Sequence, residues 1–248
     1  MSKFDYVLRL ADSPLILGQR LCEWCGHGPI LEQDIALSNI ALDLLGLSRN
    51  FFQYAAELKG EGITEDDLAF TRQEREYHNF LICEQENGHW GKTILRQFFF
   101  DVYQFYYLHA LKSSSDEKLA AIAVKSIKEV TYHMRYSSEW VVRLGDGTEE
   151  SHAKMLDALE DLWPFTGELI QFDALDLEME KNRVVNDLAQ IPEQWNNKVR
   201  DILSLATLPI PEKTWMQKGG KSGVHTEAMG FILAEMQYMQ RTYPGQQW

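Results

Sequence analysis

The chain is poor in cysteine and in positive charge, and each shortage argues against a class of protein. Its 248 residues include three cysteines, which cannot all pair within one chain, so we expect no disulfides and a reducing, cytoplasmic compartment. Lysine and arginine number 24 against 37 aspartates and glutamates, which gives a net charge of −13. This balance opposes binding to phosphate backbones, so nucleic acid is not an expected partner.

Long uncharged apolar runs are also missing. No stretch approaches the roughly 18 residues that cross a membrane. The N-terminal stretch carries Asp5, Arg9 and Asp12 and has no small-residue cleavage site, so we expect no secretory signal and no membrane association. The composition, 45% hydrophobic and 25% charged, is globular, and a single domain over residues 1–248 is the default for this length.

Helical periodicity dominates the sequence. Apolar residues recur at i, i+3, i+4 and i+7 between glycine-rich breaks, and no strand candidate survives. The predicted helices span 5–24 (irregular at Pro14), 30–59, 64–84, 89–112, 116–145, 148–170, 173–187, 192–206 and 226–242. The helix over 30–59 is apolar on nearly all sides, so we expect it to be the central and most buried one. Long helices joined by short loops predict an all-α, ferritin-like antiparallel bundle with extra helices.

Ferritin-like bundles often hold two iron ions, and the residues that bind the iron have a characteristic spacing that can be searched for in the sequence. Two helices each supply a carboxylate, and two others each supply a Glu-x-x-His pair, whose side chains project inward together. Only two of the seven histidines have a glutamate three residues before them. Glu86 and His89 straddle a helix-breaking Asn-Gly turn, whereas Glu149 and His152 lie in the first turn of a helix. Neither pair lies mid-helix, where a metal pair belongs.

The most suggestive positions form a degenerate half-site of Asp101, Glu129 and His133. His133 lies on the apolar stripe of a long helix, and a hairpin would bring it near Asp101. Val130 stands where the ligand spacing requires glutamate, and valine cannot bind a metal. A buried histidine bonded to a carboxylate explains the pair more simply. Glu129, four residues before His133, leaves a weak alternative ligand pair.

Two further motifs carry weaker signals. Cys22 and Cys25 have Cys-x-x-Cys spacing, but they close a helix and no second zinc-spaced pair exists, so we interpret them as ordinary buried thiols. Lys213, Lys218 and Lys221 make a basic, glycine-containing loop on an acidic chain. Such a loop is a candidate partner contact, and a solvated connector is the alternative.

Three separated segments resemble one family. They are RLCEWCGHGPILEQDIALSNIALDLLGLSRNFFQYAAELKGEG, IKEVTYHMRYSSEWVVRLGDGTEES, and GGKSGVHTEAMG followed by LAEMQYMQRTYPGQQW. Together they resemble the structural C subunits (PaaC) of bacterial multicomponent phenylacetyl-CoA monooxygenases, also called 1,2-phenylacetyl-CoA epoxidases. The resemblance spans nearly the whole chain.

The resemblance implies a ferritin-like fold, a cytoplasmic complex and tight pairing with a homologous catalytic A subunit. It also implies that the A subunit holds the di-iron centre and binds the CoA thioester, while the C subunit has no catalytic residues, metal or other cofactor. The remaining members of the complex are expected partners, and the isolated chain is a candidate homo-oligomer. Two alternatives stay open: a metal-binding oxidase or iron-handling protein that uses Asp101, Glu129 and His133, and a free-standing adaptor bundle.

Overall fold

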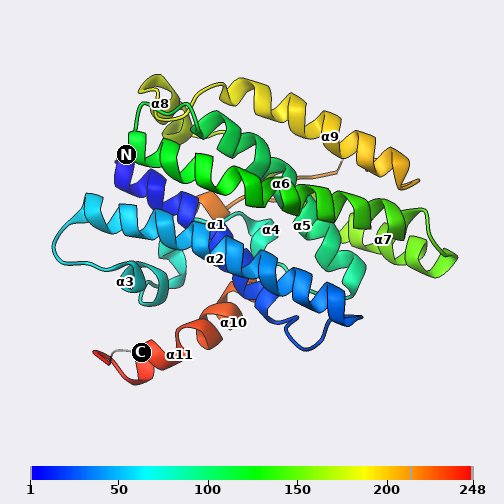
Figure 1. The fold of residues 1–248 in the computed structure, drawn as a ribbon, viewed down its shortest axis with the longest axis horizontal. Coiled ribbons are helices and arrows are strands. Elements are labelled where there is room, and N and C mark those ends of the chain that lie inside the picture. Colours follow the sequence, from blue (N-terminus) through cyan, green and yellow to red (C-terminus); the bar gives the residue numbers. More distant parts are fainter. Residues whose placement is uncertain (1, 213, 247–248) are drawn as a thin grey trace. The chain divides into compact units, whose positions relative to one another are not determined.

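The structure, a computed structural model, describes residues 2–212 and 214–246, which form helices joined by loops (Figure 1). No strand occurs in these two ranges, in agreement with the predicted all-α class. None of the described helices is both long and apolar enough to cross a membrane. The chain divides into two compact units: a terminal unit of Met1–Glu86 and Gly219–Trp248, and a middle unit of Asn87–Lys218. That 1–248 is a single domain stays a prediction.

The terminal unit is built on an antiparallel hairpin of α1 (Lys3–Cys22) and α2 (Leu31–Lys59). Ser2 and Asp5 form a capping box at the start of α1, which satisfies backbone N–H groups that the first turn leaves over. The helix continues through Pro14 without a break. The shorter helices of this unit are α3 (Glu65–Phe70), η1 (Glu74–Glu76), α4 (Leu81–Glu84), η5 (Gly220–Ser222), α10 (Glu227–Met236) and α11 (Tyr238–Thr242).

The prediction of one helix over 64–84 is wrong beyond its first turns. Thr64 does cap a helix, as its spacing to Asp67 indicated, but that helix ends at Phe70. The chain then forms the single turn η1 and runs extended from Tyr77 to Phe80, where side chains of α1 bond its backbone. The His78 N–H donates to Asp12 Oδ2 at 2.8 Å, and the Phe80 N–H donates to Ser13 Oγ at 3.1 Å. These long-range bonds replace the helical ones.

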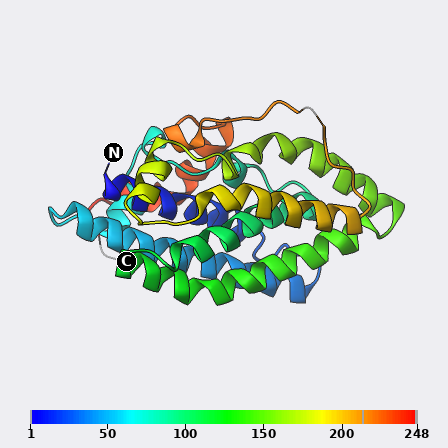
Figure 2. The same cartoon turned by 90° about the horizontal axis from the view of Figure 1, so that it is seen from above.

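The middle unit is built on a second antiparallel hairpin, of α5 (Trp90–Leu111) and α6 (Glu117–Gly145). The other helices of the unit are α7 (Glu149–Leu162), η2 (Trp163–Phe165), η3 (Gly167–Leu169), α8 (Ala174–Lys181), η4 (Leu188–Gln190) and α9 (Ile191–Leu205). α9 packs against both helices of the hairpin (Figure 2). Its buried Trp195 donates from Nε1 to the Phe99 carbonyl of α5 at 3.0 Å, which fixes α9 on the hairpin.

Among the long described helices, α5 has the largest share of buried residues, so the expectation that helix 30–59 would be the most buried one is wrong. α5 buries most of its length, including the run Phe98–Tyr103. α2 instead leaves Leu31, Ile35 and Leu42 exposed at 70%, 51% and 65%. The spacings of four and seven residues place these three side chains on one face of α2. A helix that is apolar on nearly all sides can therefore have one face buried in the protein and another apolar face exposed to solvent.

Candidate functional site

Asp101, near the middle of α5, is the centre of a polar cluster in the middle unit. Its side chain is completely buried. Gln97, one turn earlier on α5, donates from Nε2 to Asp101 Oδ1 at 2.6 Å. Ser137 of α6 donates from Oγ to Asp101 Oδ2 at 2.7 Å. Both carboxylate oxygens therefore have a protein donor.

Burial sets the charge state of Asp101. Loss of solvent raises the pKa of this carboxyl to about 7, although the charge of His133 and the hydrogen bonds from Ser137 and Gln97 oppose the rise. His133 lies on α6 and is only 1% exposed. Near neutral pH, Asp101 therefore occurs in both its protonated and its ionised form.

The structure brings Asp101 and His133 into electrostatic contact, but it does not add Glu129 to them as a third ligand. Glu129 is half-buried on α6. Within 2–212 and 214–246, no group of three or more His, Cys, Asp or Glu side chains is arranged to hold a metal ion. Val130 is 1% exposed, so an apolar side chain occupies the core position where a metal site would need a carboxylate. The donors of this cluster do not fit a di-iron centre.

The two Glu-x-x-His pairs lie at the N-terminal starts of helices. His89 is the N-cap of α5, where Nδ1 accepts from the Lys92 N–H at 3.2 Å. His152 lies in the first turn of α7 and its Nδ1 is 2.6 Å from the Gly145 carbonyl oxygen, so this nitrogen carries the proton. Each histidine bonds backbone at a helix end, as the sequence positions indicated.

A second polar cluster, in the terminal unit, was not predicted. Glu84 and His225 are both buried, with His225 Nδ1 2.8 Å from Glu84 Oε2 and Nε2 2.9 Å from the Tyr77 carbonyl oxygen. Glu84 also accepts from the Thr226 N–H at 2.6 Å and from Asn79 Nδ2 at 3.0 Å. Burial lowers the pKa of His225, but the hydrogen bond to Glu84, the charge of Glu84 and the bond to the Tyr77 carbonyl oxygen together with the charge of Glu74 outweigh burial, so the pKa is raised overall.

A neighbouring network in the same unit joins Asp12 to Arg72. The guanidinium makes two hydrogen bonds to the Asp12 carboxylate and one, of 2.6 Å, to the Glu76 carbonyl oxygen. Gln237 donates from Nε2 to the Arg72 carbonyl oxygen at 2.9 Å and to the Tyr77 hydroxyl at 2.8 Å. Segments from both ends of the chain therefore share one buried polar network. No local spacing in the sequence signals such a pairing.

The basic loop divides between the two units. Lys213 lies outside the described residues. Lys218 is exposed at the end of the middle unit, whereas Lys221 belongs to the terminal unit and is half-buried, with its Nζ 5.4 Å from the centre of the Phe80 ring. Cys22 and Cys25 are exposed free thiols, so the expectation that they are buried is wrong, whereas Cys83 is a buried thiol.

Comparison with known proteins adds two findings. The profile of a family described as "Phenylacetic acid catabolic protein" matches residues 1–248. One curated relative, the C subunit of the 1,2-phenylacetyl-CoA epoxidase of Escherichia coli (strain K12), is 50% identical over 243 residues, which cover 98% of this chain and 98% of the relative.

Proposed function

This chain belongs to the family of phenylacetic acid catabolic proteins, and from that premise we propose that it is the C subunit of a 1,2-phenylacetyl-CoA epoxidase in phenylacetate catabolism. The observation that carries the proposal is the 50% identity to such a subunit across 98% of both chains. Similarity over the full length of both proteins supports the same role in the same kind of complex.

Within that complex, we assign this subunit an architectural role. A catalytic A subunit would hold two iron ions and the CoA thioester. It would place one oxygen atom of O2 on the aromatic ring, while two electrons from a reductase and two protons convert the other atom to water. In this chain, Asp101 is bonded by Ser137 and Gln97 and Val130 occupies a required ligand position, so the polar cluster serves as a structural element of the core.

The exposed face of α2 supports association with a partner. Leu31, Ile35 and Leu42 form an apolar stripe that a monomeric protein would expose to water. Its burial against another subunit would favour the complex, and two copies of the isolated chain could cover it in the same way. We propose the A subunit and further epoxidase subunits as partners, in the cytoplasm.

Reconstitution tests this function. The chain should be purified alone, purified with the A subunit, and assayed for phenylacetyl-CoA turnover with the complete set of subunits and reductase. We expect no turnover by the chain alone, and turnover by the complete complex that falls when this chain is omitted. Activity that is unchanged without this chain contradicts the proposal.

Metal analysis separates the architectural role from the alternative of a di-metal oxidase or iron-handling protein that uses Asp101, Glu129 and His133. The chain should be expressed in iron-supplemented medium and analysed by elemental analysis and absorption spectroscopy. We expect iron far below stoichiometric amounts. About two irons per chain, lost in an Asp101→Ala variant, would favour the alternative.

A further inference from the structure

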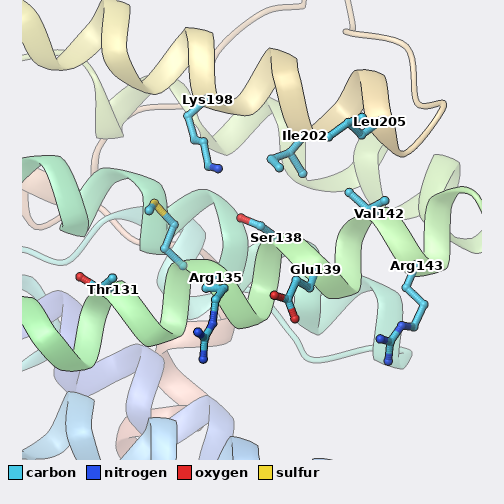
Figure 3. Close-up of a pocket in the computed structure, with 10 residues that line it drawn as sticks. Thr131, Arg135, Ser138, Glu139, Val142, Arg143, Lys198, Ile202 and Leu205 are labelled. Atoms are coloured by element: carbon cyan, nitrogen blue, oxygen red, sulfur yellow. The ribbon is translucent and has the colours of Figure 1, made fainter.

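A groove with a volume of about 680 Å³ runs between α6 and α9 of the middle unit (Figure 3). Its apolar lining comes from Met134 and Val142 of α6 and from Ile202 and Leu205 of α9. Leu205 is 62% exposed although it points into a groove that could bury it. The groove is open to solvent, so part of its apolar lining contacts water.

The two helices approach each other closely beside one end of this groove. At Gly145 a side chain would collide with the carbonyl oxygen of Ala206, so the ends of α6 and α9 approach closely only because glycine stands there. The α6 lining extends from Arg143 back over about three turns to Thr131. A rise of about 1.5 Å per residue gives the groove a length of roughly 18 Å along α6.

Two polar groups are directed into the groove without a partner of their own. Ser138 is 6% exposed, and its buried hydroxyl has no hydrogen-bond partner among the described residues. Lys198 reaches from α9 toward α6, and no ion pair is found for it in the described part of the chain. Figure 3 shows both polar ends between the two helices. A buried hydroxyl without a partner costs free energy, which an incoming acceptor would recover.

We propose that this groove is the docking site for an amphipathic helix of another epoxidase subunit, which inserts apolar side chains between α6 and α9 and places a carboxylate against Lys198 and Ser138. The ammonium and the hydroxyl both donate to an acidic side chain, so they select its charge and its position. This inference rests on the proposed function, since it takes the partner from the same complex.

The shape of the groove favours a helix over a small ligand. Pockets for small molecules enclose most of the ligand surface, whereas this groove stays open along one side. A length of roughly 18 Å matches about three turns of helix, and an amphipathic helix fills such a groove with side chains at i, i+3 or i+4, and i+7.

The test measures association of this chain with the co-purified remaining subunits by biolayer interferometry. Two variants change the groove, Lys198→Glu and Leu205→Glu. Each variant has a control that makes the same substitution elsewhere on the middle unit. The controls are Lys125→Glu and Leu177→Glu, whose side chains are exposed and do not line the groove. We expect the dissociation constant to rise about 100-fold for Lys198→Glu and at least about tenfold for Leu205→Glu. The controls should stay within about threefold of the wild type.

A second variant, Ser138→Ala, distinguishes a role of this serine in docking from a role in folding. Removing the unpartnered hydroxyl should leave the melting temperature of the free chain unchanged or raised, yet weaken association about tenfold. A lower melting temperature together with unchanged association would show that Ser138 supports the fold and has no role in docking.

The outcomes separate this inference from the proposed function. If the wild-type chain fails to associate with the other subunits, the proposed function itself is wrong. If the wild type associates and the groove variants match their controls, only the docking site is wrong. Displacement of the bound subunits from the wild-type chain by an anionic amphiphile such as anilinonaphthalene sulfonate would support the groove as the contact. Binding of that probe without any displacement would instead indicate a small-molecule site and would contradict the docking of a partner helix in the groove.

Discussion

Glu84 and His225 lie 141 residues apart in the sequence and form a buried ion pair, with Nδ1 of the histidine 2.8 Å from Oε2 of the glutamate. The second ring nitrogen is bonded to the Tyr77 carbonyl oxygen. Because both partners are acceptors, the ring makes both hydrogen bonds at once when it is protonated on both nitrogens. The pair joins the segment before α10 to the segment that contains α4, within the terminal unit.

Replacing His225 with alanine should destabilise the chain by about 3–5 kcal/mol, because the change leaves the Glu84 carboxylate buried without its charged partner. The free energy of unfolding measured by denaturant titration at pH 6 tests this. His27→Ala is the matched control, since His27 is exposed in a loop. A loss below about 1 kcal/mol would show that Glu84 is satisfied by Asn79 and the Thr226 N–H alone.

The same ion pair predicts a pH dependence. The pKa of His225 is raised in the folded chain, so its stabilising contribution is complete below the unfolded pKa of about 6.5 and is lost as pH rises through the folded value. The difference in stability between wild type and His225→Gln should therefore shrink between pH 6 and pH 9. Burial lowers the pKa of His78 and His89, which acts in the opposite direction, so the difference between variants is the informative quantity. A constant difference across this range contradicts the prediction.

Asp101 should make the chain less stable as pH rises from about 4 to 7. The folded carboxyl keeps its proton to about pH 7, whereas an unfolded aspartate releases it near 3.9, so the folded state binds more protons in this window. Asp101→Asn removes this titration and should gain stability relative to wild type between pH 5 and pH 8. Thermal melts across this range test it, with the exposed Asp146→Asn as control. Parallel pH profiles for wild type and Asp101→Asn would refute the assignment.

Val130→Glu restores a carboxylate three residues before His133, and we expect it to destabilise the chain by several kcal/mol without creating a metal site. Val130 is 1% exposed, and an additional buried carboxylate has no prepared set of partners there. Melting temperature and iron content of the purified variant are the measurements. An unchanged melting temperature would mean that the core tolerates a charge at this position, and stoichiometric iron would revive the metal alternative.

Lys218 remains the accessible candidate for a partner contact in the basic loop. If it meets an acidic surface, Lys218→Gln should slow association with the other subunits several-fold at low salt, and the effect should disappear at high salt. Folding should be unaffected, because Lys218 is exposed. The half-buried Lys221→Gln serves for comparison. Identical association rates for Lys218→Gln and wild type at low salt would leave the loop as a solvated connector.

The sequence by itself determined the helical class and the start of most helices, whereas the helices expected to end at 170 and 187 end at Leu162 and Lys181. Periodicity placed α5, α6 and α9 correctly, and the spacing of Thr64 to Asp67 identified a true cap, because helical periodicity and capping are properties of residues within one or two turns. The same local reasoning placed Val130 in the core and the two Glu-x-x-His pairs at helix ends.

Only the tertiary structure decided which residues meet across long separations. The helix expected over 64–84 ends at Phe70, because Asp12 and Ser13 of α1 bond the backbone further along the segment. Those partners lie more than sixty residues away in the sequence. The exposed face of α2, the partners of Asp101 and the pairing of Glu84 with His225 likewise depend on how helices pack. The groove between α6 and α9 and the close approach of Gly145 to Ala206 likewise join residues that are distant in the sequence. Local sequence fixes backbone preference, whereas burial and pairing are set by neighbours that only the folded chain brings together.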